Sequence, residues 1–119
     1  MNIVNRFIGG SALMVSAMLF SGTVLAAGSI SIVSPKDGAE LMSGSGNNLE
    51  YNVELSPNGN HLHVYVDSQK PIIARSVSDC PCSVELPDLS AGPHKIVIKE
   101  ATSSHDMTGV EASVSFTVK

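Results

Sequence analysis

Apolar and polar residues alternate along most of the chain beyond residue 28, which is the pattern of half-buried β-strands. The clearest case is 49–55, where every second residue is Leu, Tyr or Val and the residues between them are acidic or amide. The other predicted strands are 29–33, 61–67, 71–77, 84–86, 94–100 and 111–118. Segments rich in Pro, Gly, Asn and Ser separate these strands and predict turns.

Seven short strands in about ninety residues, with no competing amphipathic helix, predict an all-β fold. We expect a single antiparallel Greek-key β-sandwich of about seven strands over residues 27–119. A chain of this length supports one small domain with one core. The sequence contains no internal repeat and no linker to a second domain.

The segments SPKDGAEL, HLHVYVD and LPDLSAGPHKIVI resemble bacterial immunoglobulin-like or fibronectin type III-like exported domains. The resemblance spans nearly the whole chain after the N-terminal segment and implies an architecture rather than an activity. The cysteines depart from the antibody pattern, in which the two partners lie on different strands beside a core tryptophan. This chain has no tryptophan.

Residues 1–26 are predicted to be a signal peptide. Arg6 is followed by an apolar run from Phe7 to Leu25, and small residues close the segment at Ala26 and Ala27. An uncleaved anchor is the alternative, because the apolar run approaches the length of a membrane span. Cleavage would leave a periplasmic or secreted domain with no membrane attachment.

Charge and motif content exclude several function classes. The chain has a formal net charge of −4 and no cluster of Lys or Arg, so nucleic acid is not an expected partner. We find no nucleophile elbow, no carboxylate pair placed for acid–base chemistry and no Gly-rich phosphate loop. The sequence therefore predicts a protein that is not an enzyme.

The only two cysteines are Cys80 and Cys82, separated by Pro81. On an extended chain their Cα atoms would be about 6.6 Å apart with both side chains on one face, at the long edge of disulfide geometry. Four alternatives follow: a local disulfide with no further role, two thiolate ligands for a soft metal, a thiol–disulfide exchange pair, and a bond to another molecule.

His61 and His63 are spaced to project from one face of a strand, opposite the core-facing residues of that strand. They are either two solvated residues or metal ligands. In the expected sandwich, the loops with Cys80–Cys82 and with His105 and Met107 return to the same end. The predicted metal-ligand set is Cys80, Cys82, His61, His63, His105 and Met107. His94 has the parity of core residues and is expected to be partly buried at the opposite end.

Imidazole, thiolate and thioether donors favour copper or zinc over magnesium or calcium. The first hypothesis is therefore an exported, non-catalytic binding module that holds copper, or zinc as second choice, at one loop end. The alternative is a structural, protein-interaction or glycan-binding domain with a local Cys-Pro-Cys disulfide and an envelope protein as partner. The third hypothesis is a thiol-redox helper.

Overall fold

A computed structural model of the chain describes residues 28–119. The predicted signal peptide, residues 1–26, lies outside the described residues. The described part contains eight β-strands: β1 (Ser29–Ser34), β2 (Glu40–Leu41), β3 (Asn48–Glu54), β4 (His61–Val66), β5 (Ile72–Ala74), β6 (Cys82–Glu85), β7 (Gly92–Ala101) and β8 (Met107–Val118). Within residues 28–119, no helix has the length and apolar character needed to cross a membrane.

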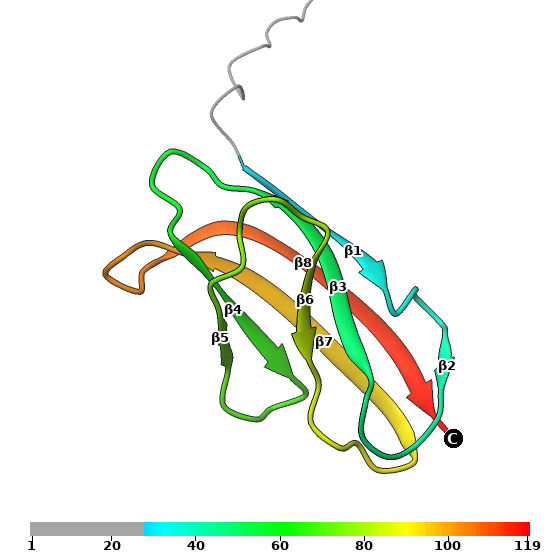
Figure 1. Cartoon of the computed structure of the whole chain (residues 1–119). Coiled ribbons are helices and arrows are strands. Elements are labelled where there is room, and N and C mark those ends of the chain that lie inside the picture. Colours follow the sequence, from blue (N-terminus) through cyan, green and yellow to red (C-terminus); the bar gives the residue numbers. More distant parts are fainter. Residues whose placement is uncertain (1–27) are drawn as a thin grey trace, which may run out of the picture.

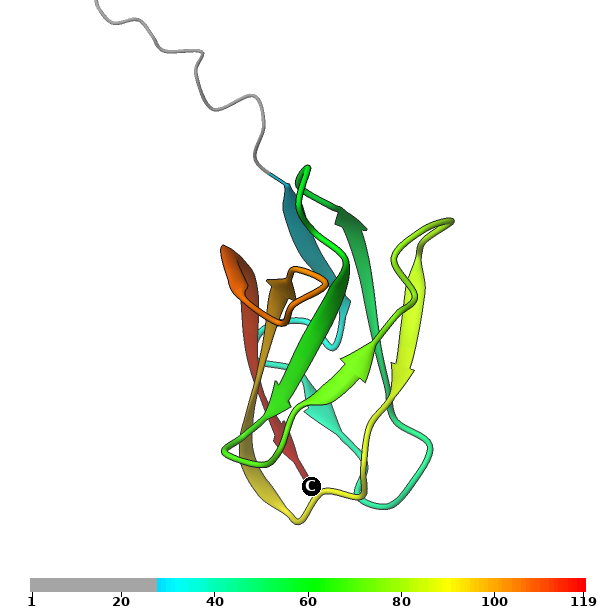
Figure 2. The same ribbon diagram turned by 90° about the vertical axis from the view of Figure 1, so that its left-hand side faces the viewer.

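The strands form two sheets that face one another (Figures 1 and 2). One sheet has the order β1-β3-β6 and the other the order β2-β8-β7-β4-β5. Neighbouring strands are antiparallel except β2, which pairs parallel with β8. The β-sandwich is therefore as the alternating pattern predicts, with the two-residue strand β2 added, which is too short to show alternation.

The core lies between the sheets and is built by the residues that alternate inward. Tyr51 is fully buried on β3, and its hydroxyl donates to the Ser76 carbonyl at 2.7 Å. Full burial of a Leu, Ile or Val side chain contributes roughly 1.5–3 kcal/mol each, so this layer holds the two sheets together. Its fully buried aliphatic members are Leu49, Leu62, Val64, Ile96 and Ile98.

A buried carboxylate fixes the loop that leads into β4. Glu100 has no exposed surface, and it accepts hydrogen bonds from the Ser56 backbone N–H at 2.8 Å and from the Thr108 hydroxyl at 2.6 Å. Burial raises the pKa of Glu100, but these hydrogen bonds outweigh it and hold the pKa below its usual value. At Gly59 a Cβ atom would meet the Glu100 carboxylate, so a larger residue there would have to displace that carboxylate. The 55–60 loop is thereby tied to the β7–β8 end of the sheet.

In the β7–β8 hairpin the strands are longer, and the loop between them is shorter, than the sequence pattern indicates. The pattern predicts a polar loop from 102 to 109 and a strand from 111, whereas β8 begins at Met107. Val110, Ala112 and Val114 continue one alternation, but Thr108 and Gly109 interrupt its apolar signal. The hairpin loop is therefore only Thr102–Asp106, and it folds beside the start of β4 (Figure 2, orange and green).

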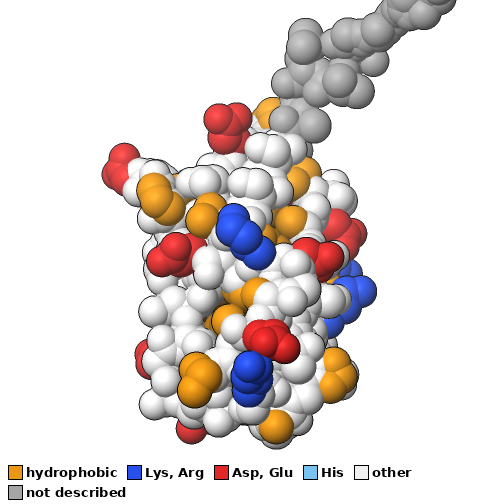
Figure 3. Space-filling view, turned by 90° about the vertical axis from the view of Figure 1, so that its right-hand side faces the viewer, with side chains coloured by type: hydrophobic (Ala, Val, Ile, Leu, Met, Phe, Trp, Pro, Cys, Tyr) orange, Lys and Arg blue, Asp and Glu red, His pale blue; other side chains and the backbone are white. Residues whose placement is uncertain are grey.

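The surface shows no concentrated charge on the face drawn in Figure 3. Acidic and basic side chains are interspersed there with isolated hydrophobic ones, and no histidine is visible. His61, His63 and His105 lie together beside the β7–β8 hairpin loop, whereas His94 lies at the other end of the sandwich beside Asp67.

Candidate metal centre

Strand β4 is buried on both faces over its first four residues. Leu62 and Val64 point into the core, whereas His61 and His63 point to the outer face of the five-stranded sheet because of the two-residue period of a strand. His61 is nevertheless only 1% exposed and His63 only 8%. The interpretation of these residues as two solvated histidines is therefore wrong, because a loop from another part of the chain covers them.

The covering loop is the β7–β8 hairpin turn, which carries His105 to the two histidines of β4. The Thr102 hydroxyl oxygen accepts from the backbone N–H groups of Ser104 and Asp106, each at 3.2 Å. The His105 N–H donates to the Thr102 carbonyl at 2.9 Å. His105 has a φ of 69°, a left-handed conformation that costs a non-glycine residue roughly 1–2 kcal/mol. The turn thus fixes His105 at its position despite an unfavourable backbone.

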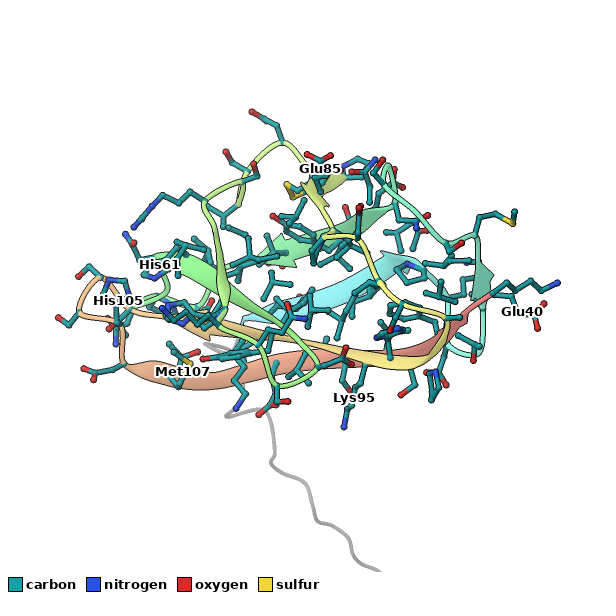
Figure 4. The ribbon with its side chains drawn as sticks, turned by 90° about the horizontal axis from the view of Figure 1, so that it is seen from below. Glu40, His61, Glu85, Lys95, His105 and Met107 are labelled. Atoms are coloured by element: carbon teal, nitrogen blue, oxygen red, sulfur yellow. A yellow bond between two sulfur atoms is a disulfide. The ribbon has the colours of Figure 1, made fainter. Side chains whose placement is uncertain are left out.

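The three imidazoles meet through one nitrogen each. His61 Nε2 lies 3.1 Å from His63 Nε2 and 3.2 Å from His105 Nδ1, and the latter two are 3.3 Å apart. The nitrogens form a nearly equilateral triangle, and these three residues are a group whose potential ligand atoms all lie within 4.8 Å of one another. Figure 4 shows His61 and His105 together at one end of the sandwich.

The outer partner of His61 leaves its inward nitrogen free to bind a cation. His61 Nδ1 lies 2.8 Å from the side-chain oxygen of Asn60, which is an acceptor, so Nδ1 carries the proton. In a neutral ring, Nε2 then presents its lone pair to the triangle. A histidine that ligates a metal typically donates its other ring N–H to a nearby oxygen in this way.

The electrostatic surroundings keep two of the rings neutral. Burial lowers the pKa of His61, and the charges of Arg75, His105 and His63 lower it further. Burial, followed by the charge of His105, also lowers the pKa of His63. A neutral imidazole is the form that binds metals, so these residues favour the ligating state at neutral pH.

The triangle has the dimensions of a tetrahedral metal site with one position open. Metal–nitrogen distances for zinc are about 2.0–2.1 Å, and an ion at that distance from three nitrogens about 3.2 Å apart would subtend N–metal–N angles of about 100–106°. The ideal tetrahedral angle is about 109°. The spacing of the three nitrogens is therefore compatible with a tetrahedral ion.

A family model describes this chain. The model of a family of unknown function, DUF6130, matches residues 12–119. The chain belongs to this family. None of the curated proteins matches the sequence.

Solved structures share the sandwich of this DUF6130 chain at low sequence identity. The fibronectin(III)-like modules of Clostridium thermocellum CbhA superpose with a TM-score of 0.59 at 16% identity, over 76% of this chain and 94% of that one. CopC from Methylosinus trichosporium OB3b superposes with a TM-score of 0.52 at 18% identity, over 77% of this chain and 93% of that one. The chain thus has a fibronectin type III-like, immunoglobulin-like fold. These similarities concern the fold alone.

In this DUF6130 member the cysteines do not join the histidines. Cys80 and Cys82 are bonded to each other in a disulfide, with Cα atoms 4.3 Å apart. Cys82 pairs with Tyr51 in the three-stranded sheet, whereas His61 and His63 are in the other sheet. The prediction of Cys80 and Cys82 as thiolate ligands is therefore wrong, and the alternative of a local disulfide is confirmed. The chain is not extended between them as assumed, and sulfurs in a disulfide cannot act as thiolates.

The remaining predicted ligand, Met107, is near the site but is not shown to belong to it. Met107 pairs with Ala101, which in turn pairs with His61 on the next strand. Its side chain is 43% exposed and lines a surface hollow with Ser56 and Thr108. Its thioether as a ligand stays a prediction.

Three residues that matter to the geometry were not found from the sequence. Asn60 sets the tautomer of His61, Thr102 shapes the turn that carries His105, and Glu100 fixes the loop before β4. Asn60 directly precedes the His-x-His segment, and a hydrogen-bonding residue at that position was the available signal. Nothing in the alternating pattern indicates the roles of Thr102 and Glu100, because these depend on turn conformation and burial.

Proposed function

We propose that this domain is an exported, non-catalytic module that holds one copper or zinc ion with the imidazoles of His61, His63 and His105. The supporting observation is the set of three ring nitrogens 3.1–3.3 Å apart. Three such nitrogens without an ion or a shared proton would repel one another through their lone pairs, so a cation between them stabilises the arrangement.

The choice of metal follows from the donor atoms. With both cysteines in a disulfide, the donors are imidazoles, which suit copper, zinc, iron and nickel. Cu(II) binds a given set of nitrogen ligands more tightly than Zn(II), so copper is the first expected ion and zinc the second. In this proposal the copper ion is held by the protein rather than used for chemistry.

Export is part of the proposal and has two supports. Residues 1–26 have the charge, apolar run and small-residue ending of a signal peptide, and a disulfide persists in oxidising compartments. The disulfide closes too small a loop to hold distant parts of the fold together.

Competition with a chromophoric chelator tests the proposal. We expect the purified domain to withdraw one Cu(II), and less tightly one Zn(II), from the chelator. His105→Gln should weaken binding by more than the roughly 10- to 100-fold that the loss of an outer partner costs. This substitution falls on an exposed loop residue, so the fold should survive it.

His94→Gln is the matched control, because it removes a histidine at the other end of the molecule. It should bind metal as the wild type does. Equal affinity in the wild type and His105→Gln, or loss of binding only in His94→Gln, would contradict the proposal. The rival hypothesis of a structural or interaction domain predicts no dependence on any of the three histidines.

A further inference from the structure

The three-histidine site has one exposed member, His105, and a cation, Arg75, close to His61 in sequence register. Arg75 directly follows β5, whose register pairs Leu62 with Ala74 and His63 with Ile73. Continued by one residue, this register brings Arg75 next to His61, on the outer face that His63 and Ile73 share. Residues directly opposite on paired strands have Cβ atoms about 4.5–5.5 Å apart. The guanidinium is therefore within reach of the histidine triangle.

Arg75 is not neutralised by the described part of the protein. The salt bridges within residues 28–119 join His94 to Asp67 and Lys119 to Glu40, and neither involves Arg75. Lys99, a second cation on this face, pairs with His63 across β4 and β7. Its ammonium lies 5.6 Å from the centre of the Tyr65 ring, so it has a partner of its own.

Protein carboxylates also do not complete the metal site. Asp106 is adjacent to His105, but no carboxylate oxygen belongs to the group of ligand atoms within 4.8 Å. Three neutral imidazoles add no negative charge. A divalent ion held by them and the Arg75 guanidinium would therefore place a total charge of +3 in a small, partly desolvated region. The repulsion between these charges is unfavourable.

We infer that the site binds a small anion of the carboxylate or oxyanion class, which occupies the fourth metal position and accepts hydrogen bonds from Arg75. The planar guanidinium is suited to such anions because it donates two parallel N–H bonds. The anion reaches the site past His105, the only exposed member of the triangle. Arg75 is a binding residue here, and the inference rests on the proposed metal site.

The test uses azide as the probe, on the purified domain loaded with one Cu(II). Azide bound to Cu(II) gives a charge-transfer absorption, and displacement of that absorption by acetate reports carboxylate binding. We expect saturable azide binding that acetate competes away. Arg75→Gln should weaken both anions about tenfold or more, as expected for loss of a hydrogen bond to a charged group. Arg75→Lys, which retains charge without the paired donors, should fall between.

Lys99→Gln is the matched control, because it removes one positive charge on the other side of His63 and should change anion affinity less than about twofold. The Cu(II) affinity of each variant is measured first by chelator competition. Copper binding with no azide absorption, or equal anion affinity in Arg75→Gln and the wild type, would overturn the anion site alone. Absence of copper binding in the wild type would overturn the metal site and the anion site together.

Discussion

Histidines in this domain occupy two opposite electrostatic environments. His61 and His63 are surrounded by other nitrogen bases and buried, so their pKa values are lowered. His94, at the other end, has a carboxylate partner instead. Its Nδ1 lies 2.7 Å from Asp67 Oδ2 and its Nε2 2.7 Å from the Ser90 carbonyl. Both oxygens are acceptors, so both ring nitrogens donate and His94 is held as the imidazolium.

The His94–Asp67 pair predicts a stability that depends on pH. The hydrogen bond to Asp67 raises the pKa of His94. Burial raises the pKa of Asp67, but the hydrogen bonds from His94 and the Lys95 N–H hold it below its usual value. His94 therefore stabilises the fold below its unfolded pKa of about 6.5, and this stability is lost as the pH rises through the raised pKa. The Asp67 contribution is lost in acid, as the pH falls through the lowered pKa.

Urea unfolding of the wild type and Asp67→Asn at several pH values measures this effect. We expect the wild type to be more stable by about 1 kcal/mol near pH 5–6, a small value because Asp67 is partly exposed and screened by solvent. The difference should shrink above the raised His94 pKa. A difference that grows from pH 6 to pH 9 would show that the assigned protonation state of His94 is wrong.

The sequence identified some of these residues and not others, for physical reasons. His61 and His63 were found because residues two apart on a strand project from the same face. His94 was correctly expected to be partly buried and distant, from its parity with Ile96. For Cys80 and Cys82 the alternative of a local disulfide is confirmed and the metal-ligand assignment is wrong, because that assignment assumed an extended chain between them. The tautomer set by Asn60 depends on side-chain placement that no spacing rule gives.

At the scale of elements, the hairpin between β7 and β8 decides whether the site exists. Strand β4, which pairs with the distant strand β7, carries two of the imidazoles. The five-residue turn supplies the third. The topology of a sandwich predicts that these loops share one end. The fold of the turn over β4 could not be predicted, because it depends on the Thr102 hydroxyl and on the left-handed backbone of His105.

Removing the Thr102 hydroxyl should weaken the metal site more than the fold. Thr102→Val keeps the shape of the side chain but leaves the N–H groups of Ser104 and Asp106 without that acceptor. A lost hydrogen bond of this kind is worth about 0.5–1.5 kcal/mol. We expect metal affinity to fall about 3- to 10-fold, measured by chelator competition, with little change in the urea midpoint.

Thr102→Ser is the matched control, since it retains the oxygen and should bind metal like the wild type. The role given to the turn would be refuted if Thr102→Ser and Thr102→Val lost affinity equally. A large loss of stability in Thr102→Val would instead show that the turn supports the sandwich as a whole.

At the scale of the whole molecule, the two sheets provide separate features. The disulfide lies at β6 of the three-stranded sheet, and the histidine triangle lies at the β4 and β7–β8 loop end of the five-stranded sheet, where Figure 4 labels His61 and His105. In the loop-entropy model, closing so short a loop stabilises the fold by roughly 1.6 kcal/mol. The apolar core between the sheets therefore holds the domain together, and the proposed metal site is an addition to one outer face rather than a structural support.

X-ray absorption at the metal edge of the zinc- or copper-loaded domain tests the three-histidine centre most directly. The predicted spectrum contains three imidazole nitrogens at about 2.0–2.1 Å and no cysteine thiolate, and one imidazole is lost in His105→Gln. A thiolate sulfur at about 2.3 Å, or a spectrum unchanged by that substitution, would contradict the assignment of His61, His63 and His105 as the ligands.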